Sequence, residues 1–109
     1  MASWYVYVLR TRAGHLYTGI ATDVARRIEE HESENGRGAK ALRGRGPLRL
    51  VYRRRVGDLG LALRVEKRLK RESKRDKEAI VSAGPTRKAL LEQFGFDPEP
   101  PRRRPRSKA

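Results

Sequence analysis

Four side chains near the start of the sequence could take part in acid–base or anion chemistry: Tyr7, Tyr17, Arg27 and His31. The tyrosines are ten residues apart, and Arg27 follows ten residues after the second. A phenol titrates at about pH 10 and an imidazole at about pH 6.5, whereas a guanidinium stays charged and can bind phosphate. Each also has a structural interpretation, because tyrosine is common in half-buried strands and helix arginines and histidines are often solvated.

Two short strands are expected to bring the tyrosines together. Trp4–Arg10 and His15–Ala21 are rich in aromatic and β-branched residues, which is typical of strands. Between them, Arg12-Ala13-Gly14 suits a three-residue hairpin loop that ends in a glycine with positive φ. Cross-strand partners share a face, so in this register one face of the hairpin carries Tyr5, Tyr7, Leu9, Tyr17, Gly19 and Ala21. Gly19 has no side chain and therefore leaves space beside Tyr7.

A helix is expected to follow, capped by Thr22 or Asp23 and ending at about Ser33. Val24 and Ile28 would form its buried stripe. Arg27 and His31 are also four residues apart, so they should project together from one flank of this helix.

The remaining chain predicts a loop, a third strand and three helices. Asn35–Pro47 is rich in glycine and basic residues, and Leu48–Arg54 alternates like a half-exposed strand. The expected helices run from the Asp58 cap to about Arg71, from about Ser73 to Ser82, and over Thr86–Phe94. Pro98–Ala109 is a low-complexity basic tail that we expect to be disordered.

Composition limits the class of protein. The 109 residues carry a net charge of +14 and contain no cysteine. One small domain is therefore expected, with a polyanionic partner and without thiol catalysis or disulfides. The longest apolar run, Trp4–Leu9, is too short to span a bilayer. We expect a soluble, cytoplasmic protein that is a monomer by default and has no obligate protein partner.

The pattern Tyr5-Val6-Tyr7, then Tyr17-Thr18-Gly19, then Arg27 and later Glu66, resembles the GIY-YIG nuclease superfamily. It is most similar to the small stand-alone bacterial branch, and the resemblance covers roughly residues 3–82. It implies an α+β fold in which a small three-stranded antiparallel sheet is flanked by helices. The expected domain spans residues 1–96, followed by the basic tail at 97–109.

The resemblance also implies roles for individual residues. Tyr7, Tyr17, Arg27 and His31 would be catalytic, Gly19 would be the structural glycine of the motif, and Glu66 would bind the metal. A single carboxylate leaves most of a cation's coordination shell to water and phosphate, as suits Mg²⁺, with Mn²⁺ as the alternative. The implied activity is metal-dependent endonucleolytic cleavage of DNA, with branched or damaged DNA as candidate substrates. The glycine-rich loop would contribute phosphate contacts through Arg37, Lys40, Arg43 and Arg45.

Two other interpretations stay open. Glu72–Ser82 lacks the asparagine that many members of the superfamily carry after the glutamate, which is compatible with a catalytically weak or inactive protein that binds DNA or RNA. The basic tail is also compatible with an RNA- or ribosome-associated accessory protein. By itself, Glu66 has the spacing of a surface ion pair with Lys70.

Overall fold

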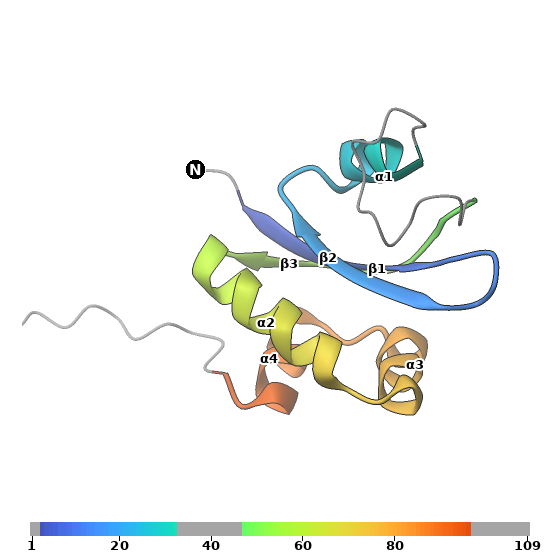
Figure 1. The fold of residues 1–109 in the computed structure, drawn as a ribbon. Coiled ribbons are helices and arrows are strands. Elements are labelled where there is room, and N and C mark those ends of the chain that lie inside the picture. Colours follow the sequence, from blue (N-terminus) through green and yellow to red (C-terminus); the bar gives the residue numbers. More distant parts are fainter. Residues whose placement is uncertain (1–2, 33–46, 97–109) are drawn as a thin grey trace, which may run out of the picture.

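The computed structural model describes residues 3–32 and 47–96, which form one three-stranded antiparallel sheet and four helices (Figure 1). Strand β1 (Trp4–Arg10) lies in the centre, with β2 (Leu16–Ala21) on one side and β3 (Arg49–Gly57) on the other. The expected α+β fold class is confirmed.

The hairpin between β1 and β2 has the predicted register. Tyr7 pairs with Gly19, and Leu9 pairs with Tyr17. The loop closes through hydrogen bonds from the Thr11 amide to the His15 carbonyl and from the Gly14 amide to the Thr11 carbonyl, both 2.9 Å long. Gly14 has φ 91°, a conformation that residues with a Cβ rarely adopt. The sequence of the turn therefore determines which side chains face the site.

Strand β3 differs from its prediction in length and in alternation. It extends to Gly57 rather than ending at Arg54. Its pairing with β1 is irregular, because Val8 pairs with Tyr52 while the next residue, Leu9, pairs with Leu50. The register shift leaves Val51 as an extra residue, and both Val51 and Tyr52 pack into the same core. A bulge of this kind interrupts the two-residue period on which the prediction depended.

The helices begin and end close to their expected positions. Helix α1 spans Val24–Glu32, and Asp23 accepts a hydrogen bond from the amide of Arg26. Helices α2, α3 and α4 are capped by Asp58, Ser73 and Thr86, each accepting from a backbone amide three residues later, and they span Leu59–Arg71, Lys74–Ala83 and Arg87–Phe94. The longest helix of the described residues has 13 residues, and none of the described helices could span a bilayer.

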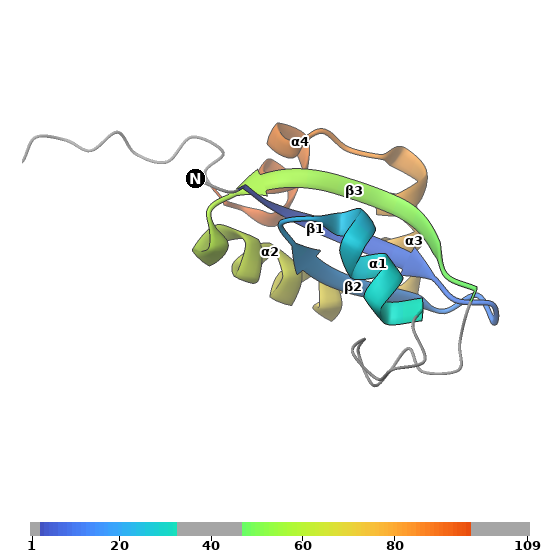
Figure 2. The same ribbon diagram turned by 90° about the horizontal axis from the view of Figure 1, so that it is seen from above.

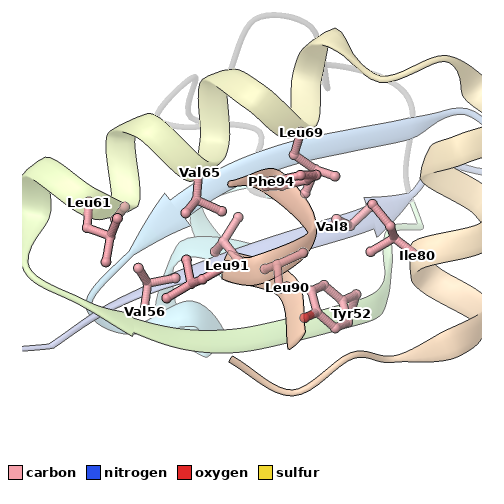
Figure 3. Close-up of a cluster of buried hydrophobic side chains, with 12 residues drawn as sticks. Val8, Tyr52, Val56, Leu61, Val65, Leu69, Ile80, Leu90, Leu91 and Phe94 are labelled. Atoms are coloured by element: carbon pink, nitrogen blue, oxygen red, sulfur yellow. The ribbon is translucent and has the colours of Figure 1, made fainter. Parts of the chain in front are cut away.

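The sheet separates two cores. Helix α1 packs on one face, while α2, α3 and α4 pack on the other (Figures 1 and 2). The larger core lies beneath the sheet, where α2 and α4 contribute Val65, Leu69, Leu90 and Leu91 (Figure 3). The smaller core, on the α1 face, consists of Tyr7, Leu9, Ala21 and Val24. The predicted site therefore lies on the thinner side of the protein.

Candidate active site

Tyr7 is the centre of the candidate site. Its side chain is 1% exposed and forms a hydrogen bond from its hydroxyl oxygen to Nε2 of His31, 2.9 Å away. Burial, together with the nearby Tyr17 phenol, raises the pKa of Tyr7 to about 12, although Arg27 acts to lower it. Tyr7 is therefore protonated at neutral pH.

His31 lies inside the protein rather than on the flank of the helix. Only 4% of the residue is exposed, and Tyr17 packs edge-on against its ring with 5.5 Å between the ring centroids. Burial, followed by the positive charge of Arg27, lowers the pKa of His31 below its ordinary value of 6.5. The ring is thus neutral at pH 7, so we assign the Tyr7 hydroxyl as donor and Nε2 as acceptor.

Arg27 lies beside the same hydroxyl and also pairs with an acid. It forms a hydrogen bond with Tyr7, and its Nη1 lies 2.7 Å from Oε1 of Glu30. The bond to Glu30 raises the pKa of the guanidinium above its already high value. Since a third of the side chain (34%) is exposed, Arg27 can still present N–H groups to an incoming anion.

Gly19 lies directly against the Tyr7 side chain. The predicted space beside Tyr7 is occupied by the Tyr7 ring itself. A Cβ on Gly19 would lie 2.5 Å from the Tyr7 hydroxyl oxygen and 2.6 Å from the ring carbon that carries it. Glycine at this position therefore lets the phenol lie flat across β2 and reach His31.

Glu66 comes from α2, on the opposite face of the sheet from α1. Its carboxylate is close enough to Tyr7 to act electrostatically on the pKa of the phenol. Oε2 of Glu66 lies 3.1 Å from Nζ of Lys70, and 19% of the Glu66 side chain is exposed. The surface ion pair with Lys70 is therefore present, and the metal-binding role of Glu66 stays a prediction.

The donor set fits a hard divalent cation bound mostly through water and substrate. The described residues contain no group of three or more metal-binding side chains. A single charged carboxylate would leave the remaining positions to water and phosphate oxygens, which Mg²⁺ accepts readily. The partly exposed pair with Lys70 is weak enough to be displaced by such an ion.

Sequence reasoning did not identify Glu30, which joins two neighbouring arginines. Besides the contact with Arg27, its Oε2 lies 3.5 Å from Nε of Arg26. The spacings of three and four residues were a visible signal for these ion pairs. Four predicted nucleic-acid contacts lie outside the described residues: Arg37, Lys40, Arg43 and Arg45. The predicted tail at 97–109 also lies outside them.

Comparison with known proteins agrees with this arrangement. The domain family described as the GIY-YIG catalytic domain matches residues 3–79. The chain belongs to the GIY-YIG family, as the tyrosine, glycine and arginine spacing indicated. Among its relatives is a UPF0213 protein of Citrobacter koseri, 54% identical over 91 residues that cover 84% of this chain and 89% of the relative.

Two further relatives support the same placement. UPF0213 protein YhbQ of Escherichia coli is 54% identical over 84 residues, which cover 77% of this chain and 82% of the relative. The solution NMR structure of the UPF0213 protein BH0048 from Bacillus halodurans is 39% identical and matches with a TM-score of 0.50, covering 87% of this chain and 99% of that one. The chain is thus a member of a group of small bacterial GIY-YIG proteins.

Proposed function

We propose that this protein is a metal-dependent endonuclease that hydrolyses phosphodiester bonds in DNA. The main support for the proposal is the hydrogen bond between the buried Tyr7 hydroxyl and the neutral His31 ring. Arg27 also acts on this hydroxyl and lowers its pKa. In this proposal the protonated phenol, which lies between an arginine and an imidazole that can accept its proton, serves in catalysis as well as in packing. Membership of the GIY-YIG family and the net charge of +14 support a polyanionic substrate.

The arrangement supplies a path for the proton of the attacking water. As the water oxygen forms its bond to phosphorus, its proton passes to the Tyr7 oxygen while the Tyr7 proton passes to Nε2 of His31. The bond from phosphorus to the leaving oxygen breaks, and that oxygen takes a proton from solvent. Tyr7 never has to exist as a free phenolate, so its raised pKa does not prevent the reaction.

Two charged residues would complete the site. Arg27 would donate hydrogen bonds to the non-bridging oxygens, where negative charge increases in the transition state. Glu66 would hold a divalent cation, with Mg²⁺ or Mn²⁺ as candidates, and the cation would supply positive charge to the phosphate and the leaving oxygen. Tyr17 would keep the His31 ring in place through its edge-on contact.

The proposal is tested by incubating the protein with Mg²⁺ or Mn²⁺ and a panel of single-stranded, duplex, flap and junction DNA. We expect cleavage that disappears on adding a chelator and falls about 100-fold or more in a Glu66→Ala variant. A Glu29→Ala variant, which removes an exposed carboxylate from α1, is the matched control and should cleave normally. Cleavage by the wild type that does not exceed that of Glu66→Ala would refute the proposal.

The alternative proposal is a nucleic-acid-binding protein with weak or no catalysis. Its support is the Glu66–Lys70 ion pair, which occupies the carboxylate, and the absence of an asparagine from Glu72–Ser82. It predicts salt-sensitive binding without cleavage of any member of the panel.

A further inference from the structure

Two recesses lie near the two ends of strand β2. The smaller has a volume of about 190 Å³ and is lined by His15, Leu16, Lys74 and Lys77. The larger has a volume of about 350 Å³, and its lining includes Ile20, the basic residues Arg26 and Arg27 and the acidic residues Asp23 and Glu30. Arg27 belongs to both the site and the lining of the larger recess.

The order of these features follows the strand. The smaller recess is at the start of β2, the contact of Tyr7 with Gly19 is near the middle, and the larger recess is at its end. A strand rises about 3.3 Å per residue, so Leu16 and Ile20 are separated by about 13 Å. B-form DNA rises about 3.4 Å per nucleotide, and this distance therefore corresponds to about four nucleotides.

The smaller recess is positively charged because the nearby acid is already neutralised. Both guanidinium nitrogens of Arg10 lie 2.8 Å from the two carboxylate oxygens of Glu78. Lys74 approaches the same carboxylate at 3.6 Å, but 61% of its side chain is exposed. Its Nζ also donates to the carbonyl of Gly14 at 3.1 Å, which fixes the lysine beside the hairpin. Lys77, three residues later, presents its charge to the same recess.

The side of α2 that carries Glu66 leads toward this recess. Lys70 follows Glu66 by one helical turn and is about half exposed, and α3 then begins at Lys74. Arg64 is about 160° around the helix from Glu66, so its charge points away from the site. On α2 and α3, the basic residues that follow Glu66 therefore lead toward Lys74 and Lys77.

From these observations we infer that Lys74 and Lys77 bind the nucleic-acid backbone on one side of the scissile phosphate. The nucleic-acid strand would run along the outer edge of β2, which is an edge strand of the sheet, from the smaller recess on the α3 side past Arg27 to the larger recess. This inference rests on the proposed function for the position of cleavage, but it makes its own claim about binding. Its occupant is a phosphodiester backbone, recognised by charge and not by base sequence.

The test measures how the affinity of duplex DNA depends on salt, in the presence of a chelator so that no cleavage occurs. Each phosphate contact contributes about 0.9 to the slope of log K against log salt concentration. The Lys74→Gln/Lys77→Gln variant should lower the slope by about 1.8. The charge-preserving Lys74→Arg/Lys77→Arg variant should keep it, as should Arg64→Gln/Lys88→Gln, which removes two exposed charges elsewhere.

A second measurement locates the DNA on the protein instead of recording a change in affinity. The chain contains no cysteine, so a Lys77→Cys variant can be labelled at one position with a photo-crosslinker. Crosslinks should lie on one side of the position opposite Tyr7, within about four nucleotides, while a labelled Lys88→Cys variant should give few.

An unchanged slope in the glutamine variant, an equal loss in the Arg64/Lys88 control, or crosslinks on both sides would each overturn the inference. The two proposals fail separately. Cleavage without the predicted slope change would overturn the binding path alone. The predicted slope change without any metal-dependent cleavage would overturn the proposed nuclease alone.

Discussion

The Tyr7 hydroxyl lies 2.9 Å from Nε2 of His31, although the two residues are 24 positions apart in the chain. The contact joins the central strand to the helix that covers it. It also joins two groups whose pKa values burial moves in opposite directions, upward for the phenol and downward for the imidazole. Both groups are therefore neutral at pH 7, which is the state needed for a proton to pass from one to the other.

Cleavage should depend on pH through His31. An imidazolium cannot accept the Tyr7 proton, so activity should be constant at neutral pH and should fall as pH drops through the His31 pKa, which lies below 6.5. In His31→Gln we expect about 100-fold slower single-turnover cleavage, together with loss of this acid limb. Glu29→Ala, at an exposed residue of the same helix, should retain both the rate and the limb. An acid limb that persists in His31→Gln would contradict the relay.

Gly19→Ala should disturb the site through its position beside Tyr7. The added methyl group would lie 2.5 Å from the Tyr7 hydroxyl oxygen, and overpacking of this kind costs about 1–3 kcal/mol. Urea unfolding should show that loss, and cleavage should fall even where the variant is folded. Gly60→Ala in α2 meets an atom no closer than 3.4 Å and should be neutral or slightly more stable. Wild-type stability and activity in Gly19→Ala would contradict this role of the glycine.

The ion pair between Arg10 and Glu78 should make the free energy of unfolding depend on pH in the acidic range. The hydrogen bonds from Arg10 lower the pKa of Glu78 from 4.5 to about 2. Because the pKa is depressed in the folded protein, the stabilisation is present above pH 4.5 and is lost as pH falls toward 2. Urea midpoints of the wild type should fall over this window more steeply than those of Glu78→Gln. Parallel pH profiles for the two proteins would show that the pair does not hold α3 against the hairpin.

Local sequence signals predicted the parts of the site that depend on neighbouring residues. The three-residue loop ending at Gly14 determined the register of Tyr7 and Tyr17, and helical spacing placed Arg27 with His31. The burial of His31 was not predictable in this way, since spacing on a helix does not say what the helix packs against. The bulge at Val51 also escaped prediction, because it departs from the regular alternation that identified the strand.

The recess at Lys74 required contacts between distant parts of the chain. Arg10 and Glu78 are 68 residues apart, and their pairing brings α3 beside the hairpin. No local pattern in either segment indicates the other. Glu66 was predictable only in part. Its place in the site was implied by the family resemblance and not by the residues around it.

The catalytic role of the Tyr7 hydroxyl can be tested by comparing wild type with Tyr7→Phe, both in DNA binding and in Mg²⁺-dependent single-turnover cleavage. The substitution keeps the ring beside Gly19 and removes the hydroxyl that contacts His31, at a cost of about 1 kcal/mol in stability. We predict unchanged binding and about 100-fold or more slower cleavage, while Tyr5→Phe, on the same face of β1, should cleave normally. Equal cleavage by Tyr7→Phe and wild type would contradict the account.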